Sequence, residues 1–298
     1  MFDTTAQLDC AGRAIRLDRA RVMGIVNVTP DSFSDGGAHA TLDAAVAHGL
    51  RLAEEGADLL DVGGESTRPG AQPVPVDEEL RRTIPVIERL VRETSIPVGI
   101  DTSSAEVMRA AVAAGAGLIN DVRALRADGA LDAAAALGVP VVLMHMAGEP
   151  GAMQAAPTYD DVVGEVHRFL AERIFAAEMA GIDRRRIVVD PGFGFGKTTA
   201  HNLALLARLQ RFTELGVPVL AGLSRKRTIG ELTGVDEPAR RVHGSVAAAL
   251  VAVQRGAMLV RVHDVGATVH ALKVWQAVDA VVPPRAKSAP PAIAWPDD

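Results

Sequence analysis

The chain of 298 residues has only one cysteine and few aromatic side chains. Both shortages limit the kinds of protein that it can be. The single cysteine, Cys10, excludes an intramolecular disulfide and any cysteine-based zinc site, as is typical of proteins from a reducing compartment. An aromatic content of 3% beside 48% hydrophobic residues predicts a large core of Ala, Val, Leu and Ile. We therefore expect a globular cytoplasmic protein in which Cys10 is an inert thiol.

The sequence also lacks long uncharged hydrophobic runs and an excess of basic residues. No run approaches the ~20 residues that a membrane span requires, and the N-terminal segment has no hydrophobic region of a signal peptide. The formal net charge of −6 argues against a broad surface for nucleic acid, although a small basic cluster can still bind a phosphorylated metabolite. We expect small-molecule partners, and neither a nucleic-acid nor a membrane partner.

Short β-branched and aliphatic runs recur along the chain without the polar alternation of half-exposed strands. This pattern predicts parallel strands that are buried on both faces. The runs are VMGIV (22–26), ADLLDV (57–62), PVGID (97–101), GLIND (117–121), PVVLMH (140–145), RIVVD (186–190), VPVLAG (217–222) and MLVRVHD (258–264). Segments with helical periodicity separate them, at about 42–55, 77–93, 104–114, 129–136, 160–181, 200–211, 241–255 and 267–279.

Eight alternating pairs of strand and helix predict a single (β/α)8 TIM barrel. A doubly wound sheet is the alternative, but it requires two domains or an unusually wide sheet, and no linker interrupts the pattern. We expect residues 1–20 to form a short N-terminal β-hairpin and extension that covers the bottom of the barrel, and residues 21–281 to form the barrel. The proline- and alanine-rich segment 282–298 is expected to be a flexible C-terminal tail.

Almost every predicted strand ends in a polar residue, and in a barrel the loops after the strands converge on one face. Asp101, Asn120 and Asp190 offer acceptors suited to a flat heterocycle with N–H and amino donors, because converging buried polar groups need a ligand to satisfy them. We interpret Asp61 and Asp121, each beside a stronger candidate, as structural. His145 likewise is more typical of a satisfied hydrogen-bonding group than of a ligand.

The basic residues are expected on a different side of the barrel mouth from these acceptors. They are Arg68 on the second loop, Arg225, Lys226 and Arg227 on the seventh, and Arg261 and His263 on the eighth. The seventh and eighth loops of such barrels frequently bind phosphate. We assign Arg227 to a solvated face and leave Arg225 open between a site role and a surface role.

Two glycine-containing loops complete the pattern. Asn27 can hold Mg²⁺ together with ligand oxygens, and the segment after it, 29–40, has the composition of a mobile lid. The stretch DPGFGFGKT (190–198) resembles a nucleotide-binding P-loop, but Pro191 stands where that motif needs a glycine and offers no N–H. The stretch therefore fails the P-loop pattern by one residue, although its three alternating glycines still indicate a specialised loop.

Taken together and in order, eight motifs resemble those of the bacterial dihydropteroate synthase family. The motifs are GIVNVTPDSFSDGG, DVGGESTRPGA, IDT, IND, LMHM, DPGFGFGKT, SRKR and RVHD. The resemblance covers about residues 21–280. It implies a barrel, commonly homodimeric, that joins 6-hydroxymethyl-7,8-dihydropterin diphosphate to p-aminobenzoate with release of diphosphate.

The resemblance also implies a role for each matched residue. The residues implied to bind the pterin are Asp101, Asn120, Met144, Asp190, Phe195, Gly222 and Lys226. Those implied to border p-aminobenzoate are Thr67, Pro69, Ser224 and Phe33, and those implied to bind the diphosphate are Asn27, Arg68, Arg261 and His263, with Asn27 also carrying Mg²⁺. The catalytic set is Asp190, Lys226, Arg261, His263, Asp31 and Asp35, the last two being alternatives from the lid.

Loss of diphosphate is expected to precede attack by the arylamine, because the ring nitrogens can delocalise the positive charge that develops on the methylene carbon. Two other functions fit the same barrel. One is a corrinoid-linked methyltetrahydrofolate methyltransferase domain, which has less use for the basic residues. The other is a non-catalytic pterin-binding paralogue, against which the intact lid and basic residues count.

Overall fold

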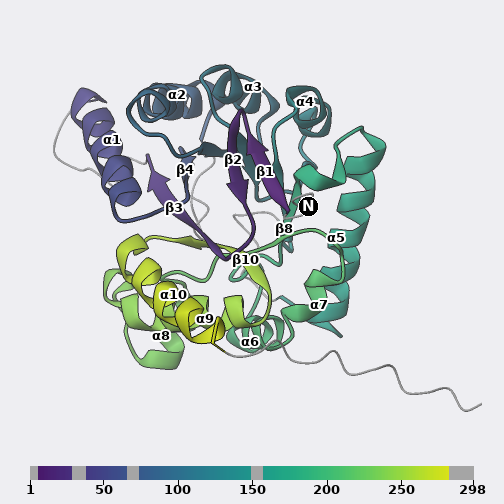
Figure 1. The fold of residues 1–298 in the computed structure, drawn as a ribbon. Coiled ribbons are helices and arrows are strands. Elements are labelled where there is room, and N and C mark those ends of the chain that lie inside the picture. The colour runs from purple at the N-terminus through teal and green to yellow at the C-terminus, as the bar shows by residue number, and fades with distance from the viewer. Residues whose placement is uncertain (1–5, 29–37, 66–73, 149–156, 282–298) are drawn as a thin grey trace, which may run out of the picture.

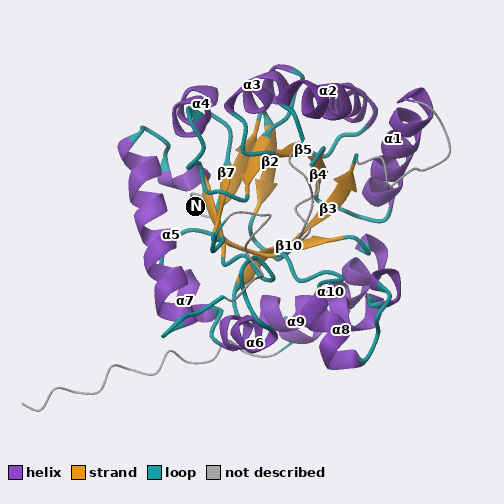
Figure 2. Cartoon of the chain, turned by 180° about the vertical axis from the view of Figure 1, so that it is seen from behind, coloured by secondary structure: helices purple, strands orange, loops and turns teal. Residues whose placement is uncertain are grey.

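A closed parallel barrel forms the body of the molecule (Figure 1, Figure 2). The computed structural model describes residues 6–28, 38–65, 74–148 and 157–281, and eight barrel strands lie within these ranges. They are β3 (Arg21–Asn27), β4 (Leu59–Gly63), β5 (Val98–Asp101), β6 (Leu118–Asp121), β7 (Val141–Met144), β8 (Ile187–Asp190), β9 (Val219–Ala221) and β10 (Ala257–Val262). Each overlaps one of the hydrophobic runs, so the predicted (β/α)8 barrel is confirmed and the doubly wound alternative is wrong.

Helices surround the barrel (Figure 2). Buried aliphatic side chains of the helices and the strands form one core cluster. The helices are α1 (Ala38–Glu54), α2 (Val76–Glu93), α3 (Ala105–Ala113), α4 (Ala130–Leu137), α5 (Val162–Met179), α6 (Thr199–Ala207), α7 (Gln210–Thr213), α8 (Arg227–Thr233), α9 (Val242–Gln254) and α10 (Val265–Asp279), with 3-10 turns at Arg184–Arg186 and Pro238–Arg240. The predicted helix 200–211 is in fact two helices, and α8 was not predicted. The N-cap of α5 is Asp161, whose side chain accepts from the Val163 N–H.

The N-terminal hairpin covers the bottom of the barrel, as predicted. Its strands β1 (Gln7–Cys10) and β2 (Arg13–Arg16) pair antiparallel, and Leu8, Cys10 and Ile15 pack with one interior layer of barrel residues. That layer consists of Met23, Leu59, Leu118, Val142, Val188, Leu220 and Leu259. Burial raises the pKa of the Cys10 thiol to about 12, so this cysteine remains protonated.

The strand register places the polar strand ends side by side at the opposite, upper end of the barrel. Asn27 is paired with Gly63, Gly63 with Asp101, and Asp101 with Asn120. Because all eight strands run parallel, their last residues reach the same mouth. The boundaries proposed at 20 and 281 remain predictions, and the segment 282–298 lies outside the described residues. Within the described ranges, no helix combines the length and hydropathy needed to cross a membrane.

Candidate active site

Arg261 stands at the centre of the barrel mouth and binds two carboxylates. Its Nε donates to Asp61 Oδ2 at 2.6 Å, and its Nη2 donates to Asp101 Oδ2 at 2.8 Å. Asn120 Nδ2 donates to the same Asp61 oxygen at 2.9 Å. These contacts join four strands, β4, β5, β6 and β10, into one hydrogen-bonded network at the mouth.

Burial dominates the electrostatics of this network. It raises the pKa of Asp101 to about 7, and the Arg261 guanidinium opposes the rise. Burial on its own lowers the pKa of Arg261, but Asp61 and Asp101 reverse this effect and hold that pKa above its usual value. Arg261 is therefore a permanent cation in this network. Asp61 is 0% exposed, and its Oδ1 has no hydrogen-bond partner among the described residues.

Asp190 and Lys226 form the second charged pair of the mouth. Asp190 Oδ1 accepts from the Gly192 N–H at 2.7 Å, while Lys226 Nζ donates to the Phe193 carbonyl and lies 4.5 Å from the centre of the Phe195 ring. Burial raises the pKa of Asp190, against the effect of nearby Lys226. Burial also lowers the pKa of Lys226 to about 8, while Asp190 acts in the opposite direction. The lysine is thus mostly protonated at neutral pH.

Gly222 lies next to both the Arg261 network and the pair of Asp190 and Lys226. A Cβ built on this glycine lies 3.7 Å from Asp190 Oδ2, 3.9 Å from Arg261 Cβ and 4.0 Å from Lys226 Nζ. The absence of a side chain at 222 therefore leaves open the space that these three residues share. Asp101, Asn120, Asp190 and Arg261 consequently face a single site.

The basic residues were expected apart from the acceptors, and for Arg261 this expectation is wrong. Its guanidinium lies between Asp61 and Asp101, inside the acidic cluster. Asp61 was set aside as structural, yet it contacts both Arg261 and Asn120. These pairings leave no pattern in the sequence, because they join residues that are 59, 160 and 200 positions apart in the chain.

The glycine-rich turn after β8 forms one wall of the site. Gly192, Gly194 and Gly196 all have positive φ, which glycine adopts without strain. A Cβ on Gly192 would lie 1.8 Å from the His145 carbonyl oxygen, so the turn packs directly against the end of β7. This contact brings Phe195 against a small apolar cluster of Val122, Met144 and Met146. The cluster lies beside Asp190, because Met144 is paired with Asp190 in the sheet.

Ser224 and His263 meet where the loops after β9 and β10 approach each other. His263 N donates to Ser224 Oγ at 3.2 Å, and His263 Nδ1 lies 3.0 Å from the same oxygen. Between them in sequence, Arg225 has φ +57 and forms a bidentate ion pair with Asp264, with Nε to Oδ2 at 3.0 Å and Nη2 to Oδ1 at 2.5 Å. Arg225, which the sequence left open, is thus engaged in an ion pair with Asp264. Arg227 is exposed and pairs with Glu231.

Asn27 ends β3, half-buried, at the edge of the mouth. Its neutral amide oxygen suits a Mg²⁺ ion that takes its remaining ligands from water and phosphate. The described ranges contain no group of three or more His, Cys, Asp or Glu side chains arranged to hold a metal, so an all-protein cage is not present there. The donor chemistry fits a shared ion. Other predicted site residues lie outside the described residues: Asp31, Phe33, Asp35, Thr67, Arg68 and Pro69.

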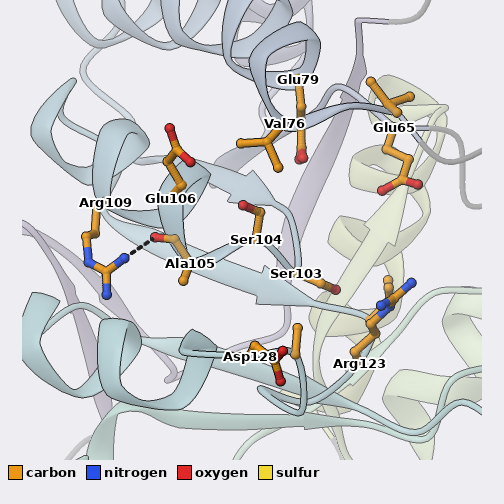
Figure 3. Close-up of a pocket in the computed structure, with 13 residues that line it drawn as sticks. Glu65, Val76, Glu79, Ser103, Ser104, Ala105, Glu106, Arg109, Arg123 and Asp128 are labelled. Carbon is orange, nitrogen blue, oxygen red and sulfur yellow. Dashed lines mark hydrogen bonds between the residues drawn. The ribbon is translucent and has the colours of Figure 1, made fainter.

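A separate cavity of about 480 Å³ opens between α2, α3 and the loop after β6 (Figure 3). None of the predicted site residues lines it. Its wall includes Glu79, which is 4% exposed and whose Oε1 has no hydrogen-bond partner in the described part of the chain. Burial raises the pKa of Glu79 to about 7. The lining of the cavity includes none of Asp61, Asp101, Asn120 and Arg261.

Comparison with known proteins yields close matches over nearly the whole chain. Residues 23–263 match the family described as pterin binding enzyme. The dihydropteroate synthase of Escherichia coli strain K12 is 50% identical over 271 residues, which is 91% of this chain and 96% of that protein.

Two solved structures from Xanthomonas albilineans are still more similar. A dihydropteroate synthase with 4-aminobenzoic acid is 74% identical with a TM-score of 0.90, over 94% of this chain and 100% of the other. A dihydropteroate synthase in complex with 7,8-dihydropteroate is 71% identical with a TM-score of 0.85, over 93% of this chain and 100% of the other.

Proposed function

The chain belongs to the dihydropteroate synthases, within the pterin binding enzyme family, and we propose that its barrel mouth carries out their condensation. The substrates are 6-hydroxymethyl-7,8-dihydropterin diphosphate and p-aminobenzoate, and the products are 7,8-dihydropteroate and diphosphate. The observation that carries the proposal is the convergence of Asp101, Asn120, Asp190 and Lys226 around Arg261 and Gly222. The named ligands of the Xanthomonas albilineans structures support it.

Each polar residue of the pterin site has one atom fixed by the protein and another available to the ring. Asn120 uses Nδ2 on Asp61, so its Oδ1 is oriented as an acceptor for ring N–H or amino groups. Asp190 uses Oδ1 on the Gly192 N–H, which leaves Oδ2 on the side of Gly222 and Lys226. Phe195 and Met144 offer apolar contact to the ring. The protein thus selects a flat ring that donates several hydrogen bonds on one edge.

The diphosphate is assigned to the residues around Arg261. This arginine uses two of its nitrogens on carboxylates, and Nη1 is directed to the ligand's oxygens; His263, Asn27 and Arg68 complete the proposed set. Mg²⁺ held through Asn27 would supply further neutralisation of the phosphate charge. Preorganised cations of this kind lower a barrier most where negative charge develops on a leaving group.

In the reaction, the C–O bond between the pterin methylene and diphosphate breaks, and diphosphate leaves with the electron pair. The ring nitrogens delocalise the resulting positive charge, and the carboxylate of Asp190 stabilises it from a buried position. The lone pair of the arylamine nitrogen then forms the C–N bond, and that nitrogen releases one proton. Lys226, held by the Phe193 carbonyl, orients the ring, so most of the acceleration comes from positioning and charge stabilisation.

The arylamine is assigned to the side of Ser224, together with Thr67, Pro69 and Phe33. Asp31 or Asp35 would act from the loop after β3. Because Ser224 Oγ is engaged with His263, the arylamine and diphosphate sites share a boundary there. We also keep as proposals a homodimer, which the family resemblance supports, and a cytoplasmic location, which the single buried cysteine supports.

The test is a turnover assay with purified protein, pterin diphosphate, p-aminobenzoate and Mg²⁺, in which released diphosphate and dihydropteroate are quantified together. Equimolar formation of both products is expected only when both substrates are present. Transfer of a methyl group from methyltetrahydrofolate to a corrinoid protein would instead support the methyltransferase alternative. Tight pterin binding without turnover would support the non-catalytic paralogue.

A further inference from the structure

We propose that Lys197 is a positioning residue for the pterin site. Its ammonium group lies behind the glycine-rich turn and fixes the backbone that carries Phe195 and that holds Asp190. The inference deepens the proposed function and rests on it, because it assigns a further residue to pterin recognition. Lys197 is outside the set of residues proposed above to contact substrate.

Lys197 is almost fully enclosed, with 2% of its surface exposed. Its Nζ donates to the Gly192 carbonyl at 2.9 Å and to the Phe195 carbonyl at 3.0 Å, and it lies 2.9 Å from His145 Nδ1. An ammonium group has three protons, and these three acceptors use them. Burying a lysine costs free energy unless its ammonium group has hydrogen-bond partners. We therefore relate the burial of Lys197 to the backbone carbonyls that it binds.

The acceptors bracket the turn. Gly192 and Phe195 are also joined by a hydrogen bond from the Phe195 N–H to the Gly192 carbonyl at 3.2 Å, so both ends of a four-residue turn point their carbonyls at Lys197. A glycine-rich turn has little intrinsic preference for one conformation, because glycine accepts most backbone dihedrals. The ammonium group therefore selects one conformation of a segment that its own sequence leaves free.

Three contacts connect this turn to the residues proposed to bind the pterin. The Gly192 N–H donates to Asp190 Oδ1, the Phe193 carbonyl accepts from Lys226 Nζ, and the Phe195 ring lies under Lys226. Each of these groups is one of the proposed pterin contacts or holds one. A shift of the turn would therefore displace Asp190, Lys226 and Phe195 together.

Charge adds to the geometric effect. Burial lowers the pKa of His145 to about 3, so its imidazole is neutral and can accept from the Lys197 ammonium at Nδ1. Burial raises the pKa of Asp190, while Lys226 and then Lys197 act against this rise. Burial also lowers the pKa of Lys197 well below its usual value, and Asp190 acts against this fall. In its protonated form, Lys197 therefore favours the ionised carboxylate of Asp190 without contacting it.

The test is Lys197→Met, which keeps the length of the side chain and removes its three donors. We expect the Kd of 6-hydroxymethyl-7,8-dihydropterin diphosphate, measured by calorimetry without p-aminobenzoate, to rise about 10-fold to 100-fold. The KM for p-aminobenzoate should stay close to that of the unaltered protein. An unchanged Kd for the pterin in a folded Lys197→Met protein would overturn the proposal.

The matched control is Arg13→Met at the bottom of the barrel. Arg13 likewise ties backbone carbonyls, those of Ile96 and Val91, at 2.7 Å each, but it lies away from the mouth. It should lower the midpoint of denaturation and leave the pterin Kd unchanged. An equal loss of pterin affinity in both variants would show a general effect of stability and would refute a positioning role.

Chemical restoration of an ammonium group at position 197 distinguishes a positioning role of Lys197 from a general effect on folding. In a Cys10→Ala background, Lys197→Cys can be alkylated with bromoethylamine while unfolded and then refolded, which restores an ammonium group at nearly the original length. Recovered pterin affinity supports the proposal, and a folded, alkylated protein that does not recover it contradicts the proposal. If Lys197→Met does not fold, Lys197→Gln provides the same comparison. Because the readout is binding, a protein that binds pterin without turnover would defeat the proposed function but not this inference.

Discussion

Replacing Asp61 with asparagine tests the central network most directly. Asp61 is completely buried and accepts from Arg261 Nε at 2.6 Å and from Asn120 Nδ2 at 2.9 Å. Asp61→Asn removes the negative charge and keeps the shape of the side chain. Its effect therefore reports the ion pair rather than a cavity.

The size of the effect follows from the burial of the pair. Removing one partner of a buried ion pair costs about 3–5 kcal/mol, because the other charge is left uncompensated. Arg261 retains Asp101 and its side chain is 20% exposed, so we take the lower end of that range, about 3 kcal/mol. For a chain of this size that corresponds to a fall in Tm of about 6 °C. The freed guanidinium should also pivot toward Asp101 and lower kcat/KM for the pterin diphosphate about 100-fold.

The assay combines denaturant unfolding with steady-state kinetics for each substrate in turn. Asp58→Asn is the control, since Asp58 pairs with Arg19 and Arg21 at distances of 2.7 and 2.8 Å at the other end of the barrel. It should lose stability and keep normal kinetics. Wild-type stability and turnover in Asp61→Asn would refute the reasoning, as would an equal kinetic loss in Asp58→Asn.

Two other substitutions test the carboxylates individually. Asp190→Asn keeps the acceptor for the Gly192 N–H but removes the buried charge, and we expect kcat/KM for the pterin diphosphate to fall about 100-fold to 1,000-fold; near-normal kinetics would contradict its role. Glu79→Gln tests the effect of burial on Glu79, which raises the pKa of this carboxyl from 4.5 to about 7. Between pH 4.5 and about 7 the folded protein retains a proton that the unfolded chain releases. The free energy of unfolding of the wild type should therefore fall as the pH rises through this window. The Gln variant should lack that fall and gain up to about 3 kcal/mol over the wild type between pH 4.5 and 8, measured by denaturant unfolding, and parallel stability curves would exclude it.

The fold was predictable because its strands are buried on both faces. A continuous aliphatic run such as 187–189 has no polar face to place in water, and eight such runs separated by helices leave few topologies other than a barrel. The shortest elements were less visible. The helix α8 has seven residues and begins at Arg227, the last residue of SRKR, so it lacks both the length and the periodicity that predict a helix.

The candidate site was predictable in its location but not in its pairings. Parallel strands deliver Asp101, Asn120 and Asp190 to one face whatever their exact register, and this is why strand ends alone indicated them. Which cation meets which carboxylate depends on side-chain reach across the mouth. From its sequence context, Asp61 was set apart from Asp101 as structural, and only the contacts of Arg261 show that both belong to the same network.

The position of Arg261 between two carboxylates affects how strongly it can bind diphosphate at each stage of the reaction. An arginine without partners would bind diphosphate tightly before and after the reaction, and uniform binding of this kind gives no acceleration. Here Asp61 and Asp101 already neutralise much of the guanidinium, so an anion must compete for it. The interaction should therefore be strongest when the leaving diphosphate gains charge in the transition state and weaker once the separated product can leave. In the proposed mechanism, the same two carboxylates that position Arg261 would therefore favour departure of the leaving group over retention of diphosphate.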